Sequence, residues 1–246
     1  MSGSSRPPPA EPGQSSARHP PDDDQTQDTQ HAGSHSQRAP PVAGHLPQPV
    51  LHLSRGFPGQ RRASDDQRAE HLAVIAAALP PGRRIQVGAE DLGRADAVLG
   101  CVLTVAENGL ADRLGATVQA NLRRASADLE RLVGAGVHIR LVKGAYVEPP
   151  SRALPYGEPT DVAYLTLAHR LAETGAEFAL ATHDGVVREA LLAALGPRPV
   201  EQLLGLRPEV LDDLVERGVP VRVYLPFGHD WFRYWMRRVA ESRGKT

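Results

Sequence analysis

The sequence is short of cysteine, of long apolar runs and of charge of one sign. Its single cysteine, Cys101, cannot form an internal disulfide, which favours a reduced, cytoplasmic protein. No run approaches the roughly 18 apolar residues of a membrane-spanning helix, and the first leucine is Leu46, too late for an apolar signal segment. The formal net charge of −1 gives no electrostatic basis for binding nucleic acid or an anionic membrane surface.

Residues 1–47 differ in composition from the rest of the chain. They are rich in Pro, Ser, Gln, Gly and His and contain no aromatic residue. Such a segment cannot bury enough apolar surface to offset the entropy of ordering, so we expect a disordered tail followed by one domain over 48–246. Its histidines have no regular ligand spacing, and we therefore expect no metal site there.

From residue 50 onward, short apolar segments alternate with amphipathic ones. Strands are expected at 50–54, 84–89, 114–120, 137–142, 177–182, 200–204 and 221–225. Helices are expected at 65–79, 95–107, 126–133, 160–174, 185–195, 208–217 and 230–241. This alternation predicts a parallel α/β sheet with right-handed crossovers. A closed eight-stranded barrel needs one more βα unit, which the tail cannot supply.

Two cationic residues lie within or directly after the predicted apolar strand at 137–142. Arg140 lies inside the strand and Lys143 follows it directly, before Gly144. A buried cation is costly unless an anion meets it. One interpretation is a pair of salt bridges at the edge of the core. The other is an anion or cofactor site at the carboxyl end of the strand, where parallel barrels carry their chemistry.

Residues 140–146 read Arg-Leu-Val-Lys-Gly-Ala-Tyr, which resembles the most distinctive strand of the proline dehydrogenase family. Four further motifs resemble the same family in the same order, at 118–122, 181–184, 203–208 and 221–238. Together they extend, with gaps, from about residue 50 to residue 241. Members of this family are FAD-dependent enzymes with a (β/α)8 TIM-type barrel. The resemblance therefore implies such a barrel here, lacking its first βα unit.

The resemblance also implies FAD as the cofactor. The residues that it places against the flavin are Gln119, Arg140, Lys143, Gly144, Ala145, Thr182, His183, Asp184, Arg238 and Glu241. Cations suit a flavin whose N1–C2 region gains negative charge on reduction, and its pyrophosphate. The amide of Gln119 can both donate and accept a hydrogen bond at the ring edge. For His183, a purely structural role is an equally reasonable interpretation.

The implied reaction is oxidation of L-proline to 1-pyrroline-5-carboxylate, with hydride transfer to flavin N5 and electrons then passing to a quinone or similar acceptor. The residues implied to contact proline are Tyr146, Leu203, Tyr224, Tyr234, Arg237 and Arg238. Adjacent guanidinium groups suit bidentate capture of a carboxylate. Without the resemblance, Arg237 and Arg238 would indicate a solvated helix face, and the tyrosines would indicate packing at the barrel rim.

Two positions depart from the family on the substrate side. His52 stands where the family has an active-site lysine, and Gly88 stands where it has an acidic residue. Losing both members of an ion pair leaves no orphaned buried charge. We expect His52, with Tyr224, to be the catalytic candidates, and His52 to act only when protonated. The alternatives are a catalytically impaired flavin-binding or regulatory barrel, and a dehydrogenase for another cyclic or secondary amino acid.

A barrel without its first strand would expose the edges of its sheet. A homo-oligomer, a separately encoded partner or a swapped strand would each cover them, and the sequence does not choose among these. Transient association with a membrane surface is also left open.

Overall fold

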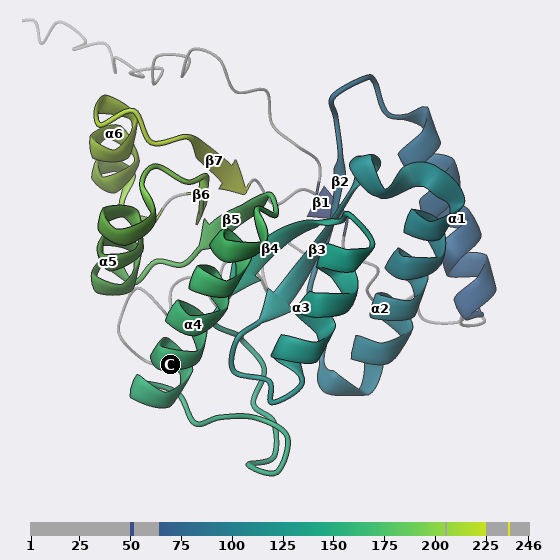
Figure 1. The fold of residues 1–246 in the computed structure, drawn as a ribbon, viewed down its shortest axis with the longest axis horizontal. Coiled ribbons are helices and arrows are strands. Elements are labelled where there is room, and N and C mark those ends of the chain that lie inside the picture. The colour runs from purple at the N-terminus through teal and green to yellow at the C-terminus, as the bar shows by residue number, and fades with distance from the viewer. Residues whose placement is uncertain (1–49, 52–63, 205, 225–235, 237–246) are drawn as a thin grey trace, which may run out of the picture. The chain divides into compact units, whose positions relative to one another are not determined.

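Residues 50–51, 64–204, 206–224 and 236 are described in the computed structural model (Figure 1). All of them belong to the second of two compact units, residues 42–246. The predicted tail over 1–47 lies outside the described residues. So does the predicted last helix over 230–241, except for Met236, which is helical.

The described strands form one parallel sheet of seven strands in sequence order. They are β1 (Val50–Leu51), β2 (Ile85–Val87), β3 (Leu114–Gln119), β4 (His138–Val142), β5 (Phe178–Ala181), β6 (Val200–Leu203) and β7 (Val221–Tyr224). Sequential parallel neighbours require a crossover after each strand. The predicted parallel α/β class is confirmed.

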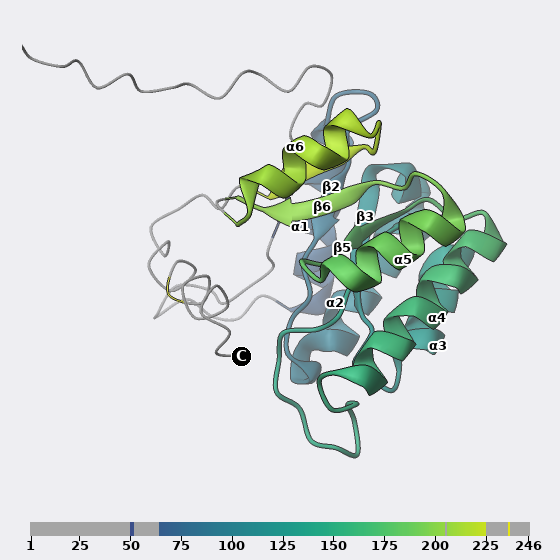
Figure 2. The ribbon, with the colours of Figure 1, turned by 90° about the vertical axis from the view of Figure 1, so that its left-hand side faces the viewer.

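Six α-helices alternate with these strands in the described part of the chain. They are α1 (Asp65–Ala78), α2 (Leu92–Val105), α3 (Ala125–Gly134), α4 (Glu158–Thr174), α5 (Gly185–Leu195) and α6 (Pro208–Glu216). The chain leaves α2 through a π-helical turn, Ala106–Leu110, and a 3-10 turn, Ala111–Arg113. Figure 2 shows α3, α4 and α5 on one side of the strands.

Helix α2 begins three residues earlier than the sequence predicts. The backbone N–H of Leu92 donates to Glu148 Oε1 at 2.8 Å, which satisfies one of the free donors of the first turn. Asp91, the N-cap residue, makes no such bond with its side chain. The cap comes from a residue 56 positions further along the chain, so no local sequence pattern could have revealed it.

Alternation of side chains gives the sheet two different faces. Ile139 and Leu141 are fully buried against the helices, on what we term the outer face. Tyr164 on α4 is also fully buried, and its hydroxyl donates to the carbonyl of Leu141 at 3.1 Å. Arg140, between the two apolar residues, lies on the opposite, inner face. Other polar residues with inner-face parity are Gln86, Thr117, Gln119, Glu201, Arg222 and Tyr224.

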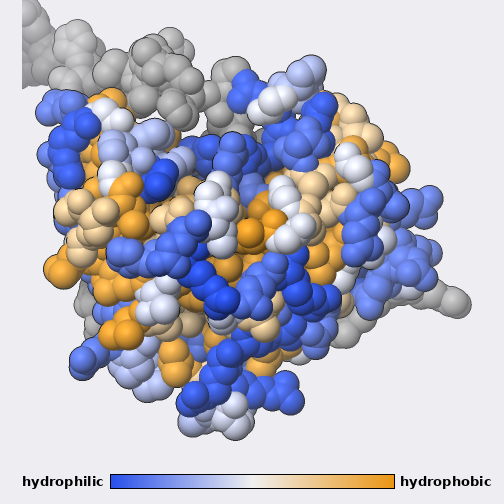
Figure 3. Space-filling model, in the orientation of Figure 1, coloured by the Kyte–Doolittle hydropathy of each residue, from blue (hydrophilic) through white to orange (hydrophobic). Residues whose placement is uncertain are grey.

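The described sheet is curled and open. Strands β1 and β7 each pair with a single neighbour among the described residues. The curled parallel sheet is thus a half-barrel, and closure into a complete TIM-type barrel stays a prediction. The helix-bearing side carries many hydrophilic residues with apolar groups between them (Figure 3). Among the helices that the structure describes, none has the length and apolar character needed to span a membrane.

Replacing Leu141 with alanine should lower the free energy of unfolding by about 2–5 kcal/mol, because the lost side chain leaves a cavity between sheet and helices. Val162→Ala on α4 is the control, since Val162 is 54% exposed and its loss should change stability by about 0.5 kcal/mol or less. Urea unfolding midpoints measure both. Equal effects in the two variants would contradict the assignment of Leu141 to the core.

Candidate functional site

An ion-pair triad joins three strands on the inner face. Arg140 Nε on β4 donates to Glu201 Oε2 on β6 at 2.6 Å. Arg222 Nη1 on β7 lies 3.4 Å from the other carboxylate oxygen, Oε1. The side chains of Arg140, Glu201 and Arg222 are 16%, 10% and 24% exposed, respectively. Glu201 therefore compensates two cations, and the triad carries one net positive charge.

The second predicted cation, Lys143, lies between two carboxylates. Its Nζ is 2.5 Å from Asp161 Oδ1 and 2.6 Å from Asp184 Oδ2. Burial alone would lower the pKa of Lys143, but the two carboxylates raise it above its usual value. For the carboxyl of Asp184, burial acts in the opposite direction and would raise the pKa. The hydrogen bond from Lys143 nevertheless lowers this pKa below its usual value. Both cations therefore pair with carboxylates, as the salt-bridge interpretation expects, while the cofactor-site interpretation stays a prediction.

Asp184 has a second structural role at the carboxyl end of β5. Its Oδ1 accepts from the backbone N–H of Val187 at 3.1 Å and caps the N-terminus of α5. Its own N–H donates to Thr182 Oγ1 at 3.1 Å. Asp184 thus connects Lys143, just after β4, to the first turn of α5, and so fixes the position of this helix relative to the strand.

Two buried amides at the end of β3 have an oxygen without a hydrogen-bond partner in the described part of the chain. Gln119 Nε2 donates to the carbonyl of Glu90 at 3.1 Å, while its Oε1 is unpaired. Oδ1 of Asn121 is also unpaired. A buried acceptor left in this state is unfavourable until a donor meets it. The acceptor on Gln119, at the carboxyl end of its strand, fits a ligand that presents an N–H group, as a flavin ring does.

Gly144 makes this arrangement possible. Its φ of +123° is a conformation that residues with a side chain rarely adopt. A Cβ at this position would overlap the amide of Asn121. The glycine that ends the strand therefore lets the following backbone pass directly over Asn121.

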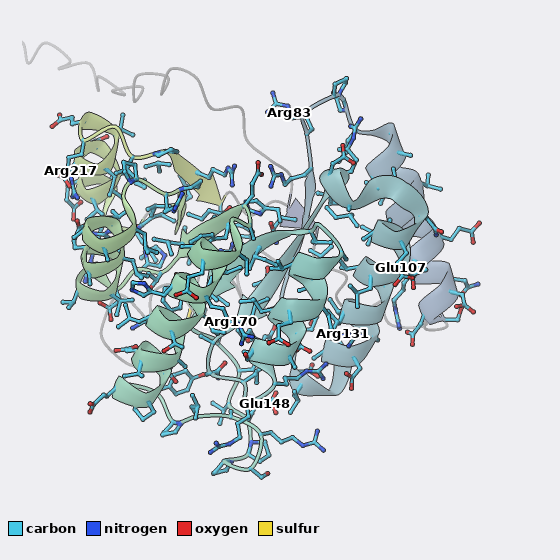
Figure 4. All side chains as sticks on the ribbon, viewed as in Figure 1. Arg83, Glu107, Arg131, Glu148, Arg170 and Arg217 are labelled. Atoms are coloured by element: carbon cyan, nitrogen blue, oxygen red, sulfur yellow. The ribbon has the colours of Figure 1, made fainter. Side chains whose placement is uncertain are left out.

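The segment 143–157, between β4 and α4, folds back over neighbouring strands. Tyr146 donates its hydroxyl to the carbonyl of Ala89, just after β2, at 3.3 Å. Glu148, labelled in Figure 4, caps α2. An isolated antiparallel bridge joins Leu122 to Ala153. These contacts hold Tyr146 near the carboxyl ends of β2 and β3. Its contact with substrate stays a prediction.

The ends of β5, β6 and β7 bring together three more predicted residues. His183 Nε2 accepts from the backbone N–H of Leu203 at 3.4 Å. Leu203 is in register with Tyr224, the last residue of β7.

Two further positions singled out from the sequence lie after other strands. Ala145, which follows β4, is exposed, and Gly88, which follows β2, is buried. The remaining predicted site residues lie outside the described part of the chain: His52, Tyr234, Arg237, Arg238 and Glu241.

Sequence reasoning missed four residues of this site, namely Glu201, Arg222, Asp161 and Asn121. Glu201 is an acidic residue within a predicted strand, and its inner-face parity is the signal that matches Arg140. Asp161 and Asn121 had no such signal, because their contacts depend on how α4 and the segment after β3 pack. The described residues contain no cluster of His, Cys, Asp or Glu that could hold a metal ion.

His138 begins β4 on the inner face and is 5% exposed. Burial, with added repulsion from Arg84 and Arg222, lowers the pKa of its imidazole from 6.5 to about 3. The unfolded chain therefore binds the extra proton between these values, so stability is lost as the pH falls through this window.

We expect the free energy of unfolding to fall by about 2 kcal/mol between pH 7 and pH 5 through His138 alone. His138→Gln, which cannot titrate, should remove this part of the pH dependence. Urea unfolding at a series of pH values measures it. The same slope in the wild type and the variant would show that other groups are responsible.

Comparison with known proteins gives one consistent family. The family model described as "Proline dehydrogenase" matches residues 15–246. Proline dehydrogenase 1 of Bacillus subtilis (strain 168) is 38% identical over 137 residues, which are 53% of this chain and 45% of that protein. Proline dehydrogenase of Deinococcus radiodurans is 32% identical over 209 residues, 82% of this chain and 67% of that protein. The chain thus spans less than half the length of the Bacillus relative.

Two solved structures share the fold at low sequence identity. Proline Utilization A (PutA) of Bradyrhizobium japonicum, mutant D779W, has a TM-score of 0.65 at 22% identity over 72% of this chain and 21% of that one. PutA of Bdellovibrio bacteriovorus, inactivated by N-propargylglycine, has a TM-score of 0.58 at 22% identity, with coverage of 72% and 22%. At this identity the likeness establishes the fold alone.

Proposed function

The chain belongs to the proline dehydrogenase family, and on that premise we propose that it oxidises L-proline to 1-pyrroline-5-carboxylate with FAD as cofactor. Bound FAD would supply the hydride acceptor at its N5 atom. One observation carries the proposal: Arg140 and Gln119, on the adjacent strands β4 and β3, offer unengaged donors and an unpaired acceptor at the expected flavin position.

Arg140 would stabilise negative charge on the ring. Only its Nε is hydrogen-bonded within the described part of the chain, so the donors on its two Nη groups remain for a ligand. Fixed donors aimed at developing charge are an effective form of electrostatic stabilisation. Gln119 would accept from a ring N–H through Oε1 while its other end stays bound to the carbonyl of Glu90.

The other predicted cofactor contacts surround this pair. Lys143, neutralised by two aspartates, would act chiefly by holding the end of β4 in place rather than as a free cation. Gly144 and Ala145 would offer backbone to the cofactor, and Thr182 and His183 would meet it from the end of β5.

The substrate would lie against Tyr146, Leu203 and Tyr224, which come from the ends of β4, β6 and β7. Holding proline in one orientation against the flavin is the main catalytic task of such a site. We further propose that Arg237 and Arg238 bind its carboxylate and that a quinone or similar acceptor removes the electrons.

FAD binding tests the first part of the proposal. The purified protein should retain bound flavin absorbance after FAD is supplied and the unbound FAD is removed. Arg140→Met should raise the dissociation constant of FAD at least tenfold, which corresponds to about 1.4 kcal/mol. Arg84→Met is the matched control. Arg84 directly precedes β2, at the amino end of the strands, and pairs there with Glu177. A protein that stays colourless, or an equal loss in both variants, would contradict it.

Activity tests the substrate side, where Gly88 is buried without a side chain. With no acid at position 88, we expect low turnover of proline that changes between about pH 6 and 8 as His52 titrates. The double variant His52→Lys, Gly88→Asp should be more active in a proline:dye-acceptor assay. Robust and equal activity of both proteins would show that this pair is dispensable.

If only the double variant is active, the chain is a flavin-binding barrel with impaired catalysis. That alternative is favoured by the loss of the acid at the buried position of Gly88. Screening other cyclic and secondary amino acids with the wild type separates impairment from a change of substrate.

A further inference from the structure

Glu201 is the acidic member of the inner-face triad, and the family resemblance gave it no role. It contacts Arg140 through Oε2 and Arg222 through Oε1, so both carboxylate oxygens are engaged. At 10% exposure it is the most buried of the three side chains. Its two partners come from strands that precede and follow β6, so the carboxylate holds the inner face together across β4, β6 and β7.

The contact to Arg140 leaves part of that side chain free. A guanidinium group is planar, with five N–H donors in a rigid fork. One donor, on Nε, is taken by Glu201 at 2.6 Å. Because the group is rigid, holding Nε also sets the plane of the two Nη groups, which make no hydrogen bond to any residue that the structure describes.

An effect of the negative charge of Glu201 on the flavin can be separated from an effect of its hold on Arg140. Glu201 is negative and lies next to the cation that would face the flavin. If it acted by charge alone, it would oppose the build-up of negative charge on the ring. If it acts by holding Arg140, its loss would remove the donors that stabilise that charge.

We propose that Glu201 is a positioning residue that orients the Nη donors of Arg140 toward the flavin ring. This inference rests on the proposed function, because the ring is the ligand that Arg140 would meet. Arg222 takes the second oxygen of Glu201 and so restrains the carboxylate from turning toward Arg140 with both oxygens. The triad would then present one net positive charge in a defined orientation.

The two roles predict opposite shifts of the reduction potential of bound FAD in Glu201→Gln. Loss of a nearby negative charge alone would favour the reduced flavin and make the potential more positive. Loss of the orientation of Arg140 should make it more negative, and should also raise the dissociation constant of FAD about tenfold. We expect the second result.

Glu177→Gln is the matched control, because Glu177 also pairs with an arginine, Arg84, but is 77% exposed and lies away from the inner face. Its FAD affinity and potential should equal those of the wild type. Glu201→Asp keeps the charge and shortens the side chain, so it too should weaken FAD binding. It carries the test if Glu201→Gln does not fold.

A double-mutant cycle links the effect to Arg140. In an Arg140→Met background, Glu201→Gln should produce no further loss of FAD affinity. Additive losses, a more positive potential in Glu201→Gln, or wild-type affinity in Glu201→Asp would each overturn the positioning role. If the wild type itself binds no FAD, the proposed function fails and the inference fails with it. If only the Glu201 variants behave as wild type, the proposed function stands and this inference is wrong.

Discussion

Charge compensation on the inner face of the sheet is the constraint on which the rest of the structure depends. Strands β4 and β7 place Arg140 and Arg222 on the same face, and Glu201 lies between them on β6. Without this carboxylate the three strands would bring two largely buried cations together. Breaking a buried pair by removing one partner typically costs about 3–5 kcal/mol. Because Glu201 takes only Nε, the N–H donors on the two Nη groups of Arg140 stay available to a ligand.

A second set of contacts fixes the carboxyl ends of the strands. Lys143 joins β4 to α4 and α5 through Asp161 and Asp184. The following segment crosses Asn121 and reaches α2, where Glu148 caps the helix. The loop that carries Tyr146 is therefore held by charge, by a helix cap and by a glycine that nothing larger could replace. A site built this way is preorganised, which is what binding a cofactor and a small substrate in one orientation needs.

The family membership of the chain can be set beside the half-barrel that its described residues form. Its family is that of proline dehydrogenases, yet it spans 67% of the Deinococcus relative and less than half of the Bacillus one. The described sheet is a curled half-barrel whose edge strands, β1 and β7, each have one neighbour in the described part. Of the residues that the resemblance places against a flavin, the described ones lie on or directly after β3, β4 and β5, in the middle of this sheet, where both neighbours are present.

The sequence by itself determined the order and type of the elements, because period-2 and helical apolar patterns are local. Strand and helix positions agree with the structure to within about three residues at each described end. It also determined that Arg140 and Lys143 must meet anions, since a buried cation requires one. Only the tertiary structure decided which anions: Glu201 is 61 residues from Arg140, and Asp184 is 41 residues from Lys143. Such pairings depend on strand register and helix packing, which no local pattern encodes.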